Sequence, residues 1–314
     1  MIKTYDTILH MRRRFFRAAL SVCIVGVTGV VLVRYLQSHP AYLTQLKQTD
    51  VRWVAAILAA DIAAISALAF LGHVLVQMTG KRLGVVENWL LTIYSSIVNF
   101  FGPLQSGPGV RAAYLKAKHG VSLRSYFLAT LFAYAVFAIL SAAALLAGTR
   151  PWWQTIIACG VVGGVSFAVI RFFQHRSTST LIKLSPQLVT GLIGCTAFQI
   201  LFLSLRYYAA LHASGAAVSL GQAISYTGAA NFAVFVSLTP DGVGIREAFL
   251  LFSQNIHHVS TVAIVSANII DRAVFMLFLG ILFMLAGILH AHKRFTPSPP
   301  KNGSGAKDKQ TYKE

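Results

Sequence analysis

Residues 106–115 read SGPGVRAAYL and residues 241–250 read DGVGIREAFL, so nearly the same decapeptide occurs twice in the chain. Glycines, an arginine and a final leucine recur at the same positions, and the two arginines, Arg111 and Arg246, are 246 − 111 = 135 residues apart. Self-similarity at a fixed spacing is the sequence signature of an internal repeat. The arrangement of the two copies therefore decides the fold.

The chain around both decapeptides has the composition of a membrane protein. Hydrophobic residues make up 56% of it and charged residues 11%, with a mean hydropathy of +0.65. Soluble domains have about 25% charged residues, so a water-soluble protein is excluded. Six apolar runs reach the roughly 20 residues that a helix needs to cross a bilayer. They are residues 15–36, 51–78, 125–147, 153–173, 187–211 and 259–289.

The charge balance indicates contact with lipid rather than with nucleic acid. The chain has 27 Lys and Arg against 9 Asp and Glu, a formal net charge of +18. These basic residues lie in short loops and tails, where they face anionic lipid headgroups. We therefore predict no nucleic-acid partner. The three cysteines have no paired spacing and no nucleotide-binding or catalytic motif occurs, so we predict no metal, no cofactor and no enzymatic activity.

Two further stretches, residues 87–118 and 220–256, are apolar but interrupted near the middle. Each is either one crossing with a loop or a re-entrant hairpin of two half-helices. After each break we expect a helix to begin, at Val110 and at Ile245. The residues that break the helices are Gly102, Pro103, Gly107, Pro108 and Gly109 in the first stretch and Pro240, Gly242 and Gly244 in the second.

The order of these segments also repeats. With small gaps, Asn99 aligns with Asn231 and residues 135–137 align with residues 273–275. The chain thus contains two copies of a unit of span, span, hairpin and span, joined near residues 148–152. If the hairpins do not cross the bilayer, each copy has three crossings and the second copy is inverted relative to the first.

Loop charge favours hairpins that do not cross. With a cytoplasmic N-terminus, this arrangement leaves few basic residues outside, namely Arg34, Lys47, Arg52, Arg150 and Arg206. We therefore predict an all-α polytopic membrane protein of two inverted repeats, each with three transmembrane helices plus one re-entrant broken-helix hairpin. The predicted segments are a basic cytoplasmic N-terminus at 1–14, the repeats at 15–147 and 153–292, and a disordered basic cytoplasmic tail at 293–314.

Two broken helices inside a bilayer predict an internal cavity, because irregular backbone is tolerated there only beside protein or water. The start of a helix attracts anions, and an arginine in its first turn adds a planar fork of donors suited to phosphate oxygens. The predicted lipid-phosphate site consists of Arg111, Arg246, Gly107, Gly109, Gly242 and Gly244. The structural alternative is that the glycines shape tight turns and each arginine caps a neighbouring helix.

Polar residues elsewhere in the spans and hairpins are candidates for supporting or coupling roles. They are Asp61, Asn99, Asn231, Asp241, Glu247, Asp271 and Arg272. Arg272 either contacts the anion or neutralises Asp61, and Asp61 is either a proton carrier or part of a structural salt bridge. The two asparagines either bond the ligand or link two helices. No residue is predicted to be catalytic.

Residues 99–115, NFFGPLQSGPGVRAAYL, and 237–252, SLTPDGVGIREAFLLF, resemble the integral-membrane flippase-like domain of bacterial lysylphosphatidylglycerol synthases, a family that includes free-standing members. The run GIREA at 244–248 is the most specific part, and the resemblance covers residues 15–289. It implies a module that moves an aminoacylated phospholipid between leaflets, while a separate soluble domain, which we expect to be absent here, attaches the amino acid. Many relatives have a Pro-Gly-Gly-like run where this chain has Pro240, Asp241 and Gly242. The resemblance therefore does not identify which lipid is moved.

We therefore expect a flippase that moves a phosphate-bearing anionic phospholipid or a polyprenyl-phosphate-type lipid across the bacterial inner membrane, with both termini cytoplasmic. The alternative is a non-transporting subunit that binds a lipid carrier and presents it to a membrane glycosyltransferase or lipid-modifying enzyme. An intramembrane enzyme would require Asp61, Glu247 and Asp271 to converge.

Overall fold

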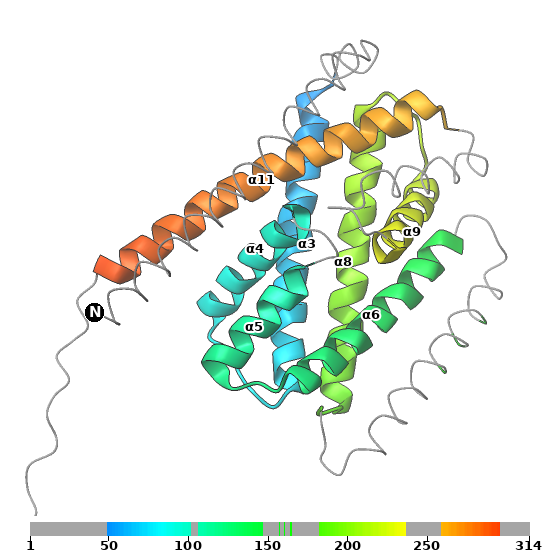
Figure 1. The fold of residues 1–314 in the computed structure, drawn as a ribbon. Helices are drawn as coiled ribbons and strands as arrows, with labels where there is room; N and C mark the ends of the chain where they lie inside the picture. The colour runs from blue at the N-terminus through cyan, green and yellow to red at the C-terminus, as the bar shows by residue number, and fades with distance from the viewer. Residues whose placement is uncertain are drawn as a thin grey trace, which may run out of the picture.

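The computed structural model describes residues 49–101, 106–146, 182–236 and 259–295, together with the single positions 157, 160 and 164. Within these ranges every regular element is an α-helix, joined by short links (Figure 1). The prediction of an all-α fold is confirmed.

Four of the described helices are long and apolar enough to cross a membrane. They are α3 (Val51–Met78), α6 (Leu123–Leu146), α8 (Pro186–Ala213) and α11 (Thr261–Phe295). The shortest has 24 residues, which at 1.5 Å each gives about 36 Å and exceeds the roughly 30 Å of hydrocarbon. Their outer faces expose large apolar side chains such as Phe70, Phe127 and Leu277. The protein is a multi-pass membrane protein, and the predicted spans at 15–36 and 153–173 lie outside the described ranges apart from positions 157, 160 and 164.

Two shorter helices, α4 (Val85–Phe101) and α5 (Gly107–His119), pack against each other as the arms of the first hairpin. With 17 and 13 residues they are about 26 and 20 Å long, too short to cross the bilayer. A Cβ at Gly107 would lie 2.5 Å from the carbonyl oxygen of Ser95, so only glycine lets the arms approach this closely. The tip of the hairpin, residues 102–105, lies outside the described residues.

Helix α5 begins three residues earlier than predicted. Its first residue is Gly107 rather than Val110, and Pro108 occupies its first turn. Proline fits there because the first N–H groups of a helix have no intrahelical partner and its fixed φ is already helical. Residues 107–109, which we counted among the helix breakers, therefore start the second arm.

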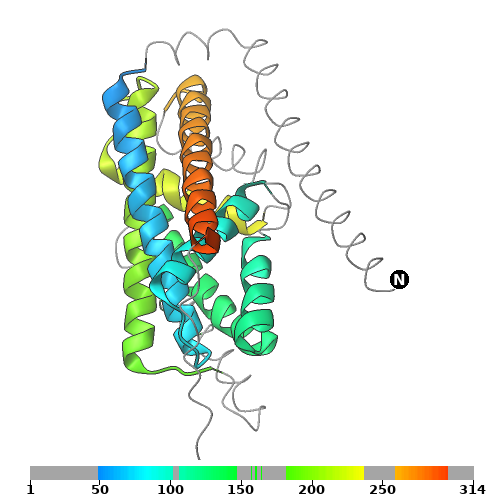
Figure 2. The same ribbon diagram turned by 90° about the vertical axis from the view of Figure 1, so that its left-hand side faces the viewer.

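Helices α3 and α8 lie side by side and run in opposite directions (Figures 1 and 2). At one end the N–H of Lys183 donates to the carbonyl of Met78 at 2.8 Å. At the other end the ring of Trp53 stacks on His212 with centroids 4.9 Å apart. The central pair of the bundle is therefore antiparallel.

The bounds of these helices reproduce the spacing of the two decapeptides. Adding 135 residues carries α3 onto α8 and α4 onto α9 (Leu220–Val236), at both ends of each helix. Because α3 and α8 are antiparallel, the chain enters α4 and α9 from opposite ends of the bundle. An inverted repeat has this arrangement. The complete two-copy architecture stays a prediction, since residues 237–258 and most of 147–181 lie outside the described part.

Candidate functional site

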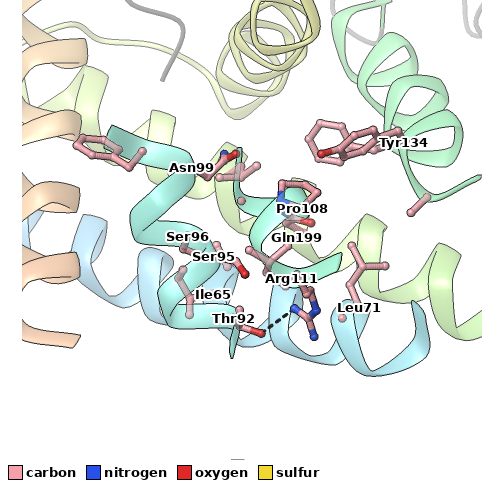
Figure 3. Close-up of a pocket in the computed structure, with 18 of the residues that line it drawn as sticks. Ile65, Leu71, Thr92, Ser95, Ser96, Asn99, Pro108, Arg111, Tyr134 and Gln199 are labelled. Carbon is pink, nitrogen blue, oxygen red and sulfur yellow. Dashed lines mark hydrogen bonds between the residues drawn. The ribbon is translucent and has the colours of Figure 1, made fainter. Parts of the chain in front are cut away.

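A cavity of about 300 Å³ lies between the helices, and each of the seven described helices contributes to its wall. Figure 3 shows the side that α4 and α5 form, with Gln199 of α8 and Tyr134 of α6 nearby. The walls combine apolar side chains, such as Leu71 and Phe275, with a few polar groups. Small-molecule sites in proteins have this composition, and their volumes begin at about 300 Å³.

Arg111 of α5 provides a charge at this cavity. Its side chain is buried, and the residue is only 5% exposed. One terminal nitrogen, Nη1, donates to Oγ1 of Thr92 at 3.1 Å, and Nη2 donates to Oδ1 of Asn88 (Figure 3 shows the bond to Thr92). Asn88 in turn donates through Nδ2 to the carbonyl of Ala69 on α3 at 2.7 Å. Helices α3 and α4 thereby fix the position of the guanidinium.

Both partners of Arg111 are neutral. Among the described residues, Arg111 forms no ion pair, and its Nε is buried without a hydrogen-bond acceptor. A buried charge without a counter-charge costs several kcal/mol. The site is therefore chemically suited to receive an anion.

The backbone of α3 makes room for this charge at Gly72. A Cβ atom built there would overlap the terminal nitrogens of Arg111. No sequence motif marks Gly72, Asn88 or Thr92, because their role depends on packing between helices rather than on spacing along the chain.

Other polar atoms along the cavity lack partners within the described part of the chain. They are Oγ of Ser95, Oγ of Ser96, Oδ1 of Asn99 and Oε1 of Gln199. Most buried polar atoms in proteins have a partner, so each exception requires an explanation such as a ligand or water. Four of them beside one unpaired arginine nitrogen indicate a binding site.

The start of α5 also faces the cavity. Gly107 and Pro108 line it, while Gly109 is exposed and does not. The N-cap Ser106 makes no side-chain bond to the first turn and donates instead to the carbonyl of Val98. The positive end of the helix dipole therefore adds to the charge of Arg111.

Asp61 and Asp271 meet at a second buried arginine, Arg206 of α8. Nη1 of Arg206 contacts Oδ1 of Asp61 at 2.9 Å, and Nε contacts Oδ1 of Asp271 at 2.8 Å. The prediction that Arg206 lies in an outside segment is wrong, because it is buried within α8 and lines the cavity. The apolar run at 187–211 already contained it, and intramembrane carboxylates require such a partner.

The structure describes some of the remaining predicted site residues and not others. Asn99 lines the cavity, whereas Asn231 lines it and also donates to Oγ of Ser141 at 3.1 Å, which links α9 to α6. The 135-residue register pairs Asn231 with Ser96 and not, as predicted, with Asn99. Arg272 is half-buried on α11. Five predicted residues lie outside the described ranges, namely Asp241, Gly242, Gly244, Arg246 and Glu247.

A polar cluster closes the base of the first hairpin. Oε1 of Glu87 on α4 accepts from Tyr114, Lys118 and His119 on α5 at 2.5, 2.8 and 2.9 Å. Burial tends to raise the pKa of the Glu87 carboxyl, but these hydrogen bonds outweigh it and lower the pKa from 4.5 to about 2. The cluster joins the start of α4 to the end of α5 and so holds the hairpin closed at its base.

Comparison with protein families gives a match over most of the chain. The family described as the lysylphosphatidylglycerol synthase TM region covers residues 18–283. A comparison with curated proteins gives no match. The family range includes all the described helices up to residue 283 of α11, and with them the whole described lining of the cavity. The chain therefore belongs to the family of the lysylphosphatidylglycerol synthase transmembrane region.

Proposed function

We propose that the protein is a lipid transporter that moves a phosphate-bearing anionic lipid between the leaflets of the bacterial inner membrane. One observation carries the proposal: Arg111 is buried at a cavity of about 300 Å³, and no carboxylate of the described residues pairs with it. Membership of the family relates the chain to membrane lipids. A lipid phosphate would supply the missing negative charge, and the guanidinium suits its oxygens.

The cavity holds the headgroup of the lipid, while the acyl or prenyl chains stay in the bilayer. A volume of about 300 Å³ fits a headgroup and leaves no room for two long chains. Arg246 occupies the position equivalent to Arg111 at the 135-residue spacing, and we propose that it reaches the same cavity from the second hairpin. Alternating exposure of the site to the two faces would move the headgroup across.

The distribution of basic residues supports a cytoplasmic position for the base of the first hairpin. Six described basic residues gather at the end of the bundle where α3 ends and α8 begins, namely Lys81, Arg82, Lys116, Lys118, Arg124 and Lys183. By the positive-inside rule this end faces the cytoplasm, and both termini are then cytoplasmic. The membrane potential would favour outward movement of an anion by about 2.3 kcal/mol per charge per 100 mV.

Lipid movement in reconstituted liposomes tests the proposal. A fluorescent phosphatidylglycerol in the inner leaflet becomes accessible to an external quencher when it crosses, and the rate is compared between wild type, Arg111→Gln, Arg246→Gln and the double variant. Arg124→Gln is the matched control, since it removes the same charge from an exposed position. We expect the two single variants and the double variant to slow the movement at least tenfold and the control to leave it unchanged.

Two results would contradict this account. Unchanged movement in the double variant would show that the arginines are not the site. Lipid that stays bound through Arg111 while wild type moves none would instead identify the accessory subunit that presents a lipid carrier to a membrane glycosyltransferase or lipid-modifying enzyme.

A further inference from the structure

Apart from Arg206, the described polar residues of the cavity that the phosphate does not use are neutral. Ser95 and Ser96 on α4 and Gln199 on α8 have buried oxygens without a hydrogen-bond partner in the described structure, as does Asn99. Hydroxyl and amide groups both donate and accept hydrogen bonds. Such groups match the hydroxyls of a polyol, which also donate and accept.

The described lining residues provide no site for an ammonium. None of the described lining residues is Asp or Glu, and Arg206, the second arginine of the wall, already contacts two carboxylates that lie behind it. A positively charged headgroup would meet Arg111 without a counter-charge in this part of the wall. The described lining therefore favours one negative charge next to a neutral, hydroxyl-bearing group.

The charged Arg111 and the neutral polar groups lie on adjacent faces of the same cavity. Thr92, which holds Arg111, is one helical turn from Ser95 and Ser96 on α4, and two turns from Asn99. Gln199 of α8 also lines the cavity, and Figure 3 shows it near Pro108 and Arg111. A phosphate at Arg111 would thus place its substituent among the neutral oxygens.

We propose that the site selects phosphate esters whose headgroup is an uncharged polyol, such as glycerol or a sugar, over aminoacylated or other cationic headgroups. This rests on the proposed function for the phosphate contact and adds the identity of the headgroup. Arg111 binds the phosphate, while Ser95, Ser96, Asn99 and Gln199 determine which substituent is accepted.

Competition between lipids of identical acyl chains tests the proposal. The purified protein is incubated with equal amounts of phosphatidylglycerol and phosphatidic acid, and bound lipid is quantified by native mass spectrometry. Phosphatidic acid carries more negative charge at pH 7, because the second pKa of a phosphate monoester is about 6. Charge alone therefore favours phosphatidic acid, and a preference for phosphatidylglycerol reports contacts with the glycerol hydroxyls.

We expect wild type to bind phosphatidylglycerol about 3- to 10-fold better than phosphatidic acid, the range expected for one or two hydrogen bonds. Ser95→Ala and Gln199→Leu should bring this ratio close to one, with phosphatidic acid taking the occupancy that phosphatidylglycerol loses. Ser95→Ala removes a single oxygen and keeps the fold even if Gln199→Leu does not. Ser66→Ala is the control, since its hydroxyl bonds to its own helix at Ile62 and lies outside the cavity.

Additional variants and ligands distinguish a failure of the polyol proposal from a failure of the proposed function. Arg111→Gln should reduce binding of both lipids, and of phosphatidic acid at least as strongly as of phosphatidylglycerol, and if it reduces neither, the phosphate site itself is wrong. A wild-type ratio near one, a ratio unaffected by Ser95→Ala, or tighter binding of lysylphosphatidylglycerol than of phosphatidylglycerol would overturn the polyol headgroup. Displacement by free glycerol 1-phosphate at the same concentration as lipid would show that the site takes a soluble phosphate ester, so the lipid would be overturned and the polyol retained.

Discussion

The guanidinium of Arg111 occupies the space beside Gly72 that the side chain of any other residue would fill. Asn88 and Thr92 on α4 accept hydrogen bonds from the same group. Three helices, α3, α4 and α5, therefore determine where the charge lies before any ligand binds. A site prepared in this way loses less entropy on binding than one that must order its arginine.

Replacing Gly72 tests this relationship. In Gly72→Ala the new methyl group displaces the guanidinium or separates α3 from α5, at a cost of about 1–3 kcal/mol. We expect binding of phosphatidylglycerol, measured in nanodiscs, to weaken about tenfold. Gly194→Ala on α8 is the control, since its Cβ would meet no atom within 4 Å. Equal affinity in Gly72→Ala and wild type would contradict the account.

Substitutions of Asn88 test whether the unbalanced charge of Arg111 governs lipid binding. Asn88→Asp places a carboxylate where Oδ1 now accepts from Arg111, so an internal ion pair replaces the contact with the ligand. We expect lipid retention to fall at least tenfold in a chain that remains folded. Asn88→Ala removes the same oxygen without adding a charge and should retain more lipid than Asn88→Asp. Equal retention in the two variants would show that charge balance at Arg111 does not govern binding.

The two buried arginines should differ in their effect on stability. Arg206→Gln removes the cation that Asp61 and Asp271 both contact, and loss of one partner from a buried ion pair lowers the free energy of unfolding by about 3–5 kcal/mol. Arg111→Gln removes a charge that no described carboxylate balances, so unfolding in lipid-free detergent should need as much free energy as before, or more. Unfolding by SDS titration measures both. Similar losses in both variants would mean that Arg111 is a structural residue.

The lowered pKa of Glu87 predicts that acid destabilises the first hairpin. Its pKa is about 2 in the folded protein and 4.5 without its partners, so the folded carboxyl binds a proton less readily. The stabilisation is complete above pH 4.5 and is lost as the pH falls towards about 2. Thermal unfolding midpoints between pH 5 and pH 3 should therefore drop more steeply for wild type than for Glu87→Gln. Parallel curves would rule out the contribution of this cluster.

Much of the fold is predictable because a long apolar segment in a membrane can adopt few structures, chiefly a helix that spans the bilayer. The apolar run at 51–78 has the same bounds as α3, and the spacing of Arg111 and Arg246 reappears in the bounds of α8 and α9. The start of α5 was misplaced because Pro108 can either break a helix or begin one, and its position relative to Ser106 decides which.

The cavity is only partly predictable from the sequence. Arg111 is recognisable as a repeated intramembrane charge. The residues that surround Arg111 cannot be recognised from the sequence. Gly72, Asn88 and Thr92 come close to it only when α3, α4 and α5 pack against one another. The assignment of Arg206 to a loop was wrong because counting basic residues outside the membrane ignores the two carboxylates, Asp61 and Asp271, that allow it to lie inside.

The number of phosphate-bearing lipids that each chain retains after gentle extraction tests the lipid-phosphate site at Arg111. Native mass spectrometry of wild type, Arg111→Gln and the control Arg124→Gln provides it. We expect one retained lipid phosphate per chain in wild type and in the control, and a loss of at least tenfold in Arg111→Gln. Equal retention in all three proteins would contradict a lipid-phosphate site at Arg111.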